Sequence, residues 1–263
     1  MTEQDKLDLW QKFNHFQKSR ERTYTPKIRK ALQFQVNQFI AAKQLGYTDN
    51  EALGFITSTK LYEVLKPLYM DAGINYGAKT IAYLRTQKAR MPIGFNRLMT
   101  DLLNQYFQID LLNIVEDITA FTKEKIRDVL IAAYAVGSSF PEIVNELSAI
   151  GFTQNRARLI ARTETVTAAN TGSYLAAKTT GLKLKKIWIA AHDNRTRRRP
   201  RDKYDHLNMD GVEVGYEDKF DVSGEFMLHP GDRKHGAKAG NICNCRCTFG
   251  HKAIRDINGR LMQ

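Results

Sequence analysis

The chain has 263 residues, of which 43% are hydrophobic and 26% charged, a mixture typical of globular proteins that excludes a largely disordered chain. Its formal net charge of +12 favours a polyanionic partner such as nucleic acid, an anionic membrane or an acidic protein face, although many soluble proteins are basic without one. The N-terminus lacks the basic start and apolar stretch of a signal peptide, and the longest apolar run, residues 129–136, is too short to span a bilayer. We therefore expect a soluble protein that is made in the cytoplasm and does not contact a membrane.

The first two thirds of the chain have the apolar spacing and the punctuation of successive helices. Pro26 fits the first turn of one helix, and Pro67 is expected to kink or split another. Thr48 and Ser139 each begin the spacing of a capping box, and Gly137 is a helix stop. The predicted helices cover residues 7–16, 25–46, 58–86, 96–107, 111–119, 123–136, 139–151 and 154–180.

The pattern changes after Gly181. Residues 182–191 alternate between apolar and basic side chains, as a strand does. Short β-like pieces follow at residues 212–214, 225–228 and 242–249. The sequence therefore predicts an α+β protein with a mostly helical N-terminal region, residues 1–152. A C-terminal domain, residues 153–263, would begin with the long helix and end in a small, turn-rich, β-containing module.

Inside the long helix, the motif ARTE places Arg162 and Glu164 two positions apart. Residues two apart on a helix do not face each other, so each side chain must find a partner elsewhere, for example across an interface. The alternative is a solvated helix face.

A strongly basic segment follows Trp188 and Asp193. Six basic side chains lie within nine residues, which creates a strong local positive potential, and guanidinium groups match the geometry of phosphate. The candidate phosphate contacts are Arg195, Arg197, Arg198, Arg199, Arg201 and Lys203. No aromatic residue is interleaved with them, so base stacking is not indicated. A protein partner and a merely solvated loop remain alternatives.

The three cysteines, Cys243, Cys245 and Cys247, are an odd number in one short segment, which does not resemble a disulfide framework. If the segment is a strand, their side chains share one face. Zinc binds thiolate and imidazole ligands in a tetrahedral set, and His206, His229, Cys245 and Cys247 are the candidate ligands. The C-x-C-x-C spacing differs from the usual C-x-x-C knuckle. Reduced thiols packed as small apolar groups and redox chemistry are the alternatives, so zinc is indicated without being required.

These features form an ordered series. In chain order, its members are Arg162 and Glu164, Trp188, Asp193 followed by RTR at residues 195–197, His206, Asp210 and Gly211, residues 230–232, and NCRC at residues 244–247, which includes Asn244 and Arg246. Over about residues 153–251 the series resembles the phage Mu F-like domain of minor head, or head morphogenesis, proteins. Cys243 is an addition to the family's NCRC pattern, and His235 and His251 are not part of it.

The resemblance implies a minor component of the capsid interior that is present in few copies and associates with the portal vertex. Members of the family in some phages accompany DNA into the host, and the family has no established catalytic residues. We therefore expect a non-enzymatic minor head protein of a tailed bacteriophage. It would contact the portal protein, the inner capsid and, without sequence preference, packaged DNA. Its place would be the virion interior, after assembly in the host cytoplasm.

Two other functions compete with this one. Asp193, His206, Asn208, His229 and the cysteines suggest a metal-dependent nuclease site, with the arginines holding the substrate. A phage-delivered effector is the other alternative. The sequence contains no P-loop, no G-x-S-x-G, no H-E-x-x-H and no zinc-deaminase pattern, so other common enzyme classes have no motif here.

Overall fold

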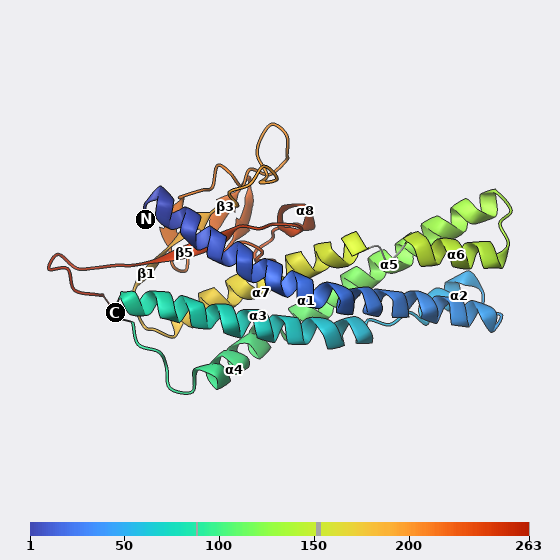
Figure 1. The fold of residues 1–263 in the computed structure, drawn as a ribbon, viewed down its shortest axis with the longest axis horizontal. Helices are drawn as coiled ribbons and strands as arrows, with labels where there is room; N and C mark the ends of the chain where they lie inside the picture. The colour runs from blue at the N-terminus through green and yellow to red at the C-terminus, as the bar shows by residue number, and fades with distance from the viewer. Residues whose placement is uncertain (88, 151–153, 263) are drawn as a thin grey trace. The chain divides into compact units, whose positions relative to one another are not determined.

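The computed structural model describes residues 1–87, 89–150 and 154–262, and the fold is α+β, as predicted (Figure 1). The helices are α1 (Glu3–Gln44), α2 (Asp49–Gly54), α3 (Thr59–Thr86), α4 (Phe95–Phe107), α5 (Asp110–Ala135), α6 (Phe140–Ile150), α7 (Gln154–Lys178) and α8 (Ala239–Ile242). The strands are β1 (Leu184–Ile189), β2 (Glu213–Gly215), β3 (Phe220–Val222), β4 (Glu225–Met227) and β5 (Thr248–Ala253). Among the described residues, no helix combines the length and apolar character needed to cross a membrane.

Both prolines predicted to begin or interrupt helices lie inside continuous ones. Helix α1 passes through Pro26, so the predicted helix start at this proline is wrong. Helix α3 passes through Pro67 without splitting. Buried side chains flank each proline, Ile28 beside the first and Leu68 beside the second. Packing along the whole helix therefore outweighs the one backbone hydrogen bond that a proline removes.

Helix α5 is also one helix where the sequence predicts two. Thr119 and Thr122, at the predicted gap, are buried. The Thr119 hydroxyl donates to the Val115 carbonyl at 2.7 Å and the Thr122 hydroxyl to the Ile118 carbonyl at 3.0 Å. These bonds satisfy each hydroxyl within the helix, so the polar side chains do not interrupt it.

Two predicted helix ends and the predicted capping box at Thr48 are confirmed. Gly46 and Gly137 have φ angles of 88° and 73°, in the left-handed region that favours glycine, and each follows a helix end. Thr48 forms a complete capping box with Glu51. Ser139, before α6, donates from both its backbone N–H and its hydroxyl to the Glu142 carboxylate at 2.7 Å.

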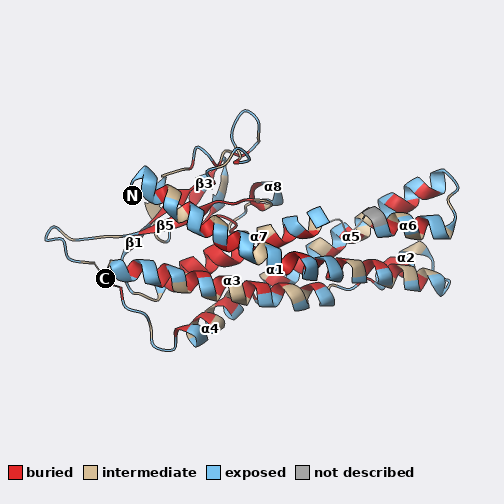
Figure 2. Cartoon of the chain, viewed as in Figure 1, coloured by how far each residue is buried: buried red, intermediate tan, exposed pale blue. Residues whose placement is uncertain are grey.

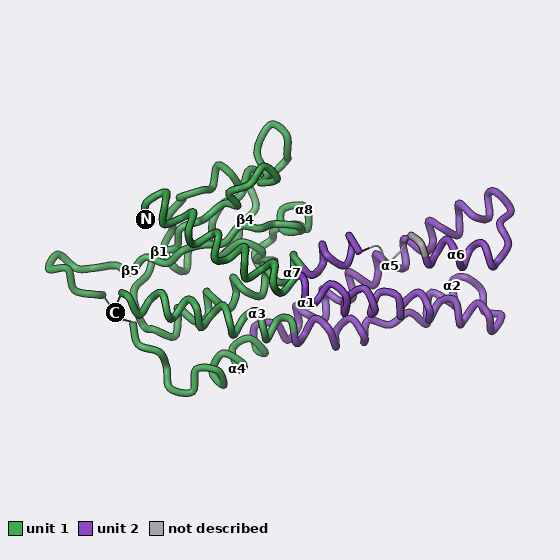
Figure 3. The backbone as a smooth tube through the Cα atoms, viewed as in Figure 1, with its two compact units in different colours: residues 1–21, 68–105, 162–263 green, residues 22–67, 106–161 purple. Residues whose placement is uncertain are grey.

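The chain forms two compact units (Figure 3). Unit 1 comprises residues 1–21, 68–105 and 162–263, and unit 2 comprises residues 22–67 and 106–161. Helices α1, α3, α4 and α7 each contribute residues to both units. The predicted domain boundary between residues 152 and 153 lies outside the described residues, so the division into 1–152 and 153–263 stays a prediction.

Unit 1 contains both sheets. Strand β1 is central, with β2 and β5 antiparallel on its two sides, and β3 pairs with β4 in a separate hairpin. Trp188 of β1 is fully buried opposite Phe249 of β5, and Trp10 of α1 belongs to the same apolar cluster. Figure 2 shows the buried residues of the strands and of α7 in red. The first helix of the chain thus completes the core of the C-terminal module.

Three glycines allow α3 and α7 to approach each other closely in unit 1. A Cβ on Gly172 would overlap the backbone of Gly73, and a Cβ on Gly77 would lie 3.0 Å from the Gly172 carbonyl oxygen. Side chains at these positions would push the two backbones apart. The glycines therefore bring α7 against α3 at the segment of α7 that carries the polar motif residues.

Unit 2 is helical and contains a buried polar network. Gln35 of α1 is fully buried and donates to the Thr119 hydroxyl at 2.8 Å and to the Thr57 carbonyl at 3.0 Å. Its carbonyl oxygen accepts from Thr122 at 3.1 Å, and Arg156 of α7 donates to the same threonine at 2.9 Å. Burial lowers the pKa of Arg156 to about 10.

Candidate metal centre

Residues 163–174 of α7 are buried on every side, although many of them are polar. A helix buried all round is normally apolar, and buried polar groups need hydrogen-bond partners. The loops of unit 1 supply most of those partners. The polar side chains of α7 therefore act as attachment points for the segments that carry the other motif residues.

The ARTE residues find the distant partners that their spacing requires. Arg162 donates two hydrogen bonds to the Glu21 carboxylate, at 2.9 and 3.0 Å, and one to the side-chain oxygen of Asn244 at 2.6 Å. Glu164 is buried and accepts from the Tyr69 hydroxyl at 2.5 Å and from Arg233 at 2.7 Å. The motif is therefore not a solvated helix face.

Further along α7, Asn170 holds two loops at once. Its side-chain amide donates to the carbonyls of Pro230 and Cys247, at 2.9 and 3.2 Å, and its side-chain oxygen accepts from Thr248 at 2.8 Å. Thr167 donates to the Gly231 carbonyl at 3.1 Å. Gly231 has a φ of 86°, and a Cβ there would press against Thr167, which accounts for glycine in the motif.

Two aspartates of the motif series form ion pairs with basic side chains of unit 1. Asp193 accepts two hydrogen bonds from the buried Arg246, both at 2.9 Å, and this pairing with the guanidinium lowers the pKa of Asp193 despite the opposing effect of its burial. Asp210 accepts from Lys6 of α1 at 2.6 Å and from the backbone N–H of Ala190 at 2.8 Å. These carboxylates hold the segments that flank the basic loop.

The cysteine segment is not a strand, contrary to the prediction. Helix α8 ends at Ile242, Cys243 caps it, and Asn244 adopts a φ of 62°, a left-handed conformation that asparagine tolerates. Strand β5 begins only at Thr248. The turn at Asn244 breaks the alternation of an extended chain, and Cys243 is not part of the group that Cys245 and Cys247 form.

That group consists of His206, Cys245 and Cys247, whose candidate ligand atoms all lie within 4.8 Å of one another. The distance from His206 Nδ1 is 3.5 Å to Cys245 Sγ and 3.6 Å to Cys247 Sγ. All three side chains are buried, with exposed fractions of 3% or less. Three of the four predicted ligands therefore converge, in an apolar cluster that includes Trp188 and Phe220.

A hydrogen bond from Cys247 lowers the pKa of the Cys245 thiol well below its ordinary value, although burial opposes this shift. Burial and the neighbouring Cys245 raise the pKa of Cys247. Cys245 therefore loses its thiol proton more readily than Cys247. Thiolate is the form of cysteine that binds metals.

Asn241 of α8 fixes the tautomer of His206. The Asn241 side-chain amide donates to the Val222 carbonyl at 3.2 Å and to the Glu225 carboxylate at 3.1 Å, which leaves its oxygen as an acceptor. That oxygen lies 2.7 Å from His206 Nε2, so Nε2 carries the proton and Nδ1 presents its lone pair to the two sulfurs. No local pattern singles out Asn241, because its partners are distant in the chain.

The fourth predicted ligand, His229, lies elsewhere. Its ring stacks on Phe249, its Nε2 lies 3.3 Å from the Thr171 hydroxyl, and its Nδ1 lies 3.3 Å from the Pro230 carbonyl. Burial lowers its pKa, which favours a neutral ring. His229 therefore anchors the Pro230–Asp232 turn to α7 and is not part of the converging group.

The basic segment divides into residues that shape the loop and residues that face solvent. Arg201 donates to the carbonyls of Asn194 and Thr196, at 2.9 and 2.6 Å, and half-buried Arg197 donates to the Cys243 carbonyl. The remaining predicted phosphate contacts, Arg195, Arg198, Arg199 and Lys203, are exposed, as Arg201 also is.

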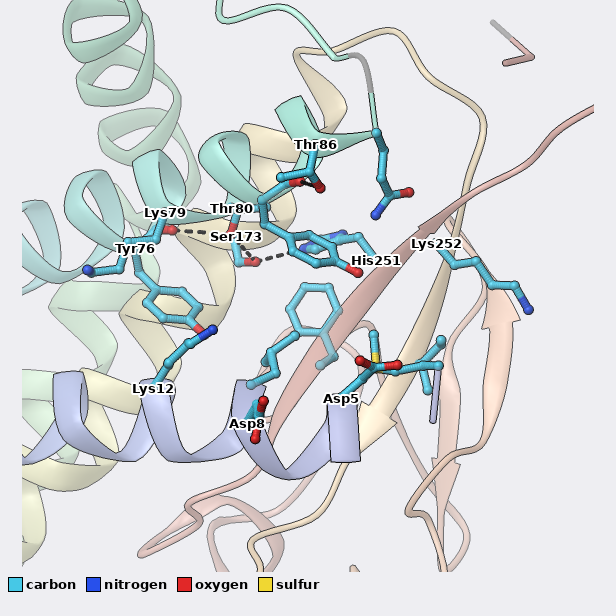
Figure 4. A pocket seen from close by; sticks show the side chains of 16 residues that line it. Asp5, Asp8, Lys12, Tyr76, Lys79, Thr80, Thr86, Ser173, His251 and Lys252 are labelled. Atoms are coloured by element: carbon cyan, nitrogen blue, oxygen red, sulfur yellow. Dashed lines mark hydrogen bonds between the residues drawn. The ribbon is translucent and has the colours of Figure 1, made fainter. Parts of the chain in front are cut away.

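A cavity of about 630 Å³ lies elsewhere in unit 1, between α1, α3 and strand β5 (Figure 4). At its wall, Ser173 lies 2.8 Å from His251 Nε2 and 2.7 Å from the Thr80 hydroxyl, and Thr80 lies 3.1 Å from the Tyr76 carbonyl. One assignment satisfies every donor: His251 donates to Ser173, Ser173 to Thr80, and Thr80 to the carbonyl. In that direction His251 is not a base for Ser173, and its Nδ1 has no hydrogen-bond partner among the described residues.

The sequence is similar to one known protein family. Residues 124–250 match the family model described as phage Mu protein F like protein. This part of the chain belongs to the phage Mu protein F like family. The match confirms the resemblance drawn from the motif series. It begins within α5, earlier than the predicted limit near residue 153.

Two curated relatives share part of the chain. One, named NAD(+)--arginine ADP-ribosyltransferase EFV, from Enterococcus faecalis, is 35% identical over 118 residues, which are 43% of this chain and 22% of that protein. The other, named uncharacterized protein YqbB, from Bacillus subtilis, is 29% identical over 127 residues, which are 47% of this chain and 40% of that protein. The matches thus cover less than half of either relative. No solved structure matches the chain.

Proposed function

We propose that this chain is a minor head protein of a tailed bacteriophage, located inside the head near the portal, where it contacts the portal protein, the inner capsid and packaged DNA. The observation that carries the proposal is the phage Mu protein F like match over residues 124–250. The net charge of +12 suits a protein enclosed with densely packed DNA. The role is one of assembly and docking, with no bond made or broken.

The basic loop, residues 195–203, supplies the DNA contact in this proposal. Its exposed arginines offer forked donors that fit phosphate oxygens. The loop is internally braced, because Arg201 binds two of its carbonyls and the Asp202 carboxylate accepts from the backbone N–H of Arg198 at 3.0 Å. A braced loop loses less conformational entropy on binding than a mobile one.

Location is tested on particles of the phage, or induced prophage, that encodes the chain. Mass spectrometry of purified virions and procapsids should detect the protein in few copies, and crosslinking should join it to the portal protein. Protease should digest it only after the particles are opened, because it lies inside. Absence from both kinds of particle contradicts the proposal.

The DNA contact is tested by measuring the affinity of the full chain for duplex DNA across a salt series. Replacing Arg195, Arg198 and Arg199 with serine should weaken binding and reduce the slope of log affinity against log salt by about 3, since each phosphate contact contributes about one. The matched control replaces Lys27, Arg29 and Lys30, an exposed basic cluster on α1, with serine. Equal losses in both triple variants would mean that only net charge matters.

The alternative of a metal-dependent nuclease is tested with the same protein. Burial of the His206 group leaves no path for a nucleic acid strand, which argues against that role. Only 22% of the Enterococcus faecalis relative is aligned, so its named activity is not assigned to this chain. Plasmid incubated with the chain and divalent metals should remain intact. Cleavage that disappears in His206→Ala would favour the enzyme instead.

A further inference from the structure

We propose that His206, Cys245 and Cys247 bind one thiophilic metal ion, with Zn²⁺ as the physiological occupant, as a brace inside unit 1. The proposal stands on the geometry of three side chains and does not depend on the proposed function. The three ligand atoms come from two segments: His206 follows the basic loop, and the two cysteines precede β5.

The spacing of the ligand atoms fits a tetrahedral zinc centre. Zinc lies about 2.3 Å from a thiolate sulfur and about 2.05 Å from an imidazole nitrogen, and at a tetrahedral angle these bonds separate sulfur and nitrogen by about 3.6 Å. The observed distances from Nδ1 to the two sulfurs are 3.5 and 3.6 Å. Both nitrogen-to-sulfur distances therefore match a tetrahedral ion, and the two sulfurs lie within 4.8 Å of each other.

Hydrogen bonds account for part of this arrangement, because Cys247 donates to Cys245 and the Cys245 thiol can donate to His206 Nδ1. Nδ1 of neutral His206 has a single lone pair in the ring plane, which serves one S–H donor well. Two sulfurs nevertheless lie at nearly equal distances from it. A metal ion that all three atoms bind accounts for both distances at once.

The donors also select the class of ion. Two thiolates and one imidazole favour Zn²⁺ and similar soft or borderline ions, whereas Mg²⁺ and Ca²⁺ require oxygen ligands. Among the described residues, no fourth His, Cys, Asp or Glu joins the group. The fourth tetrahedral position is therefore assigned to a small exogenous ligand such as water.

The bound ion would have a structural effect, because the site is buried and lies in the apolar cluster around Trp188. It would fasten the end of the basic loop to the turn that precedes β5. Asn241 supports the site through its hydrogen bond to His206 Nε2, the kind of outer contact that fixes the orientation of a metal-bound histidine. Removing the ion should lower the thermal stability of unit 1 and loosen the loop.

The test is metal analysis of the full chain, purified under reducing conditions from cells supplied with zinc. Wild-type protein should contain about one zinc per chain. Cys245→Ser and Cys247→Ser should contain almost none, with folding checked by circular dichroism. Cys243→Ser is the matched control and should retain the metal, because Cys243 belongs to the same motif but not to the group. Equal metal content in all four proteins, whether one or zero, overturns the proposal.

A second measurement remains informative if the cysteine variants do not fold. Titrating metal-free wild-type protein with Co²⁺ should produce a thiolate-to-cobalt charge-transfer band and the ligand-field bands of a tetrahedral ion, both saturating at about one equivalent. Cys243→Ser should give the same spectrum. No charge-transfer band in wild-type protein, or a band that depends on Cys243, refutes the site.

Discussion

Two polar stretches of unit 1 differ in what their side chains do. Residues 163–174 of α7 are buried, and most of their polar groups bind distant loops of the same unit. Residues 195–203 are largely exposed, and several of their arginines face solvent. Similar polarity in the sequence thus corresponds to opposite roles. The first stretch organises the fold, and the second is available to a partner.

The difference can be tested because it predicts where substitutions affect stability. Changes in the buried stretch leave polar groups without partners or force backbones apart, and both effects are costly. Changes in the exposed loop alter charge and leave the core intact, so they should act on binding.

The largest effect is expected at Gly172. Gly172→Ala places a methyl group against the backbone of Gly73, which cannot move aside as a flexible side chain would. The free energy of unfolding should fall by at least about 3 kcal/mol, at the upper end for overpacking. Chemical denaturation measures it. The control is Gly54→Ala, where a new Cβ meets nothing within 4 Å, so stability should hardly change. A stable Gly172→Ala protein would mean that the two helices are not so close.

The next effect is expected at Glu164, the buried carboxylate that accepts from Tyr69 and Arg233. Glu164→Ala should lower the free energy of unfolding by about 3 kcal/mol, because a buried charge network loses one member. Glu124→Ala, at an exposed position of α5, should change it by less than about 0.5 kcal/mol. Similar values for the two variants would remove the distinction between buried and exposed polar residues.

Local signals predicted much of the fold. The capping box at Thr48, the pairing of Ser139 with Glu142 and the stop at Gly137 depend on neighbouring residues only, and all three are observed. The predicted helix start at Pro26 is wrong and α3 does not split at Pro67, because the packing that keeps both helices continuous comes from distant residues. Residues 220–222 form β3 without having been predicted, since so short a strand has little pattern of its own.

The candidate site was predictable only in part, because residue chemistry identifies candidate ligands but the fold decides which of them converge. Residue chemistry identified His206, Cys245 and Cys247 as candidate ligands, and the fold brings them together. The same reasoning included His229, because sequence cannot tell which histidine approaches the cysteines. The left-handed turn at Asn244 also could not be foreseen, and it decides which two of the three cysteines converge.

A pH-dependent effect is expected from His251, which lies against the buried stretch through Ser173. Burial, together with Lys186, lowers the pKa of His251 to about 3, below an unfolded value of about 6.5. Between these values the unfolded chain binds more protons, so stability is retained above pH 6.5 and lost as the pH falls below it. This residue alone contributes a slope of about 1.4 kcal/mol per pH unit.

Urea denaturation across that pH range measures the slope. His251→Gln should have a shallower slope than wild type, while His15→Gln, at an exposed position, should match wild type. The comparison between variants matters, because burial also lowers the pKa of His229, which adds to the slope in every protein. A wild-type slope in His251→Gln would show that this ring is protonated as easily in the folded protein as in the unfolded chain.

The smallest effects are expected within the basic loop, where the two roles meet. Arg201→Ala removes hydrogen bonds to the carbonyls of Asn194 and Thr196 and should lower the free energy of unfolding by about 1 kcal/mol. Arg198→Ala, at an exposed position, should change it by less than about 0.5 kcal/mol while reducing the salt slope of DNA binding by about 1. The opposite ranking, with stability dependent on Arg198 and not on Arg201, would mean that the loop is braced by different residues. In that case, the division between shaping and binding arginines would have to be redrawn.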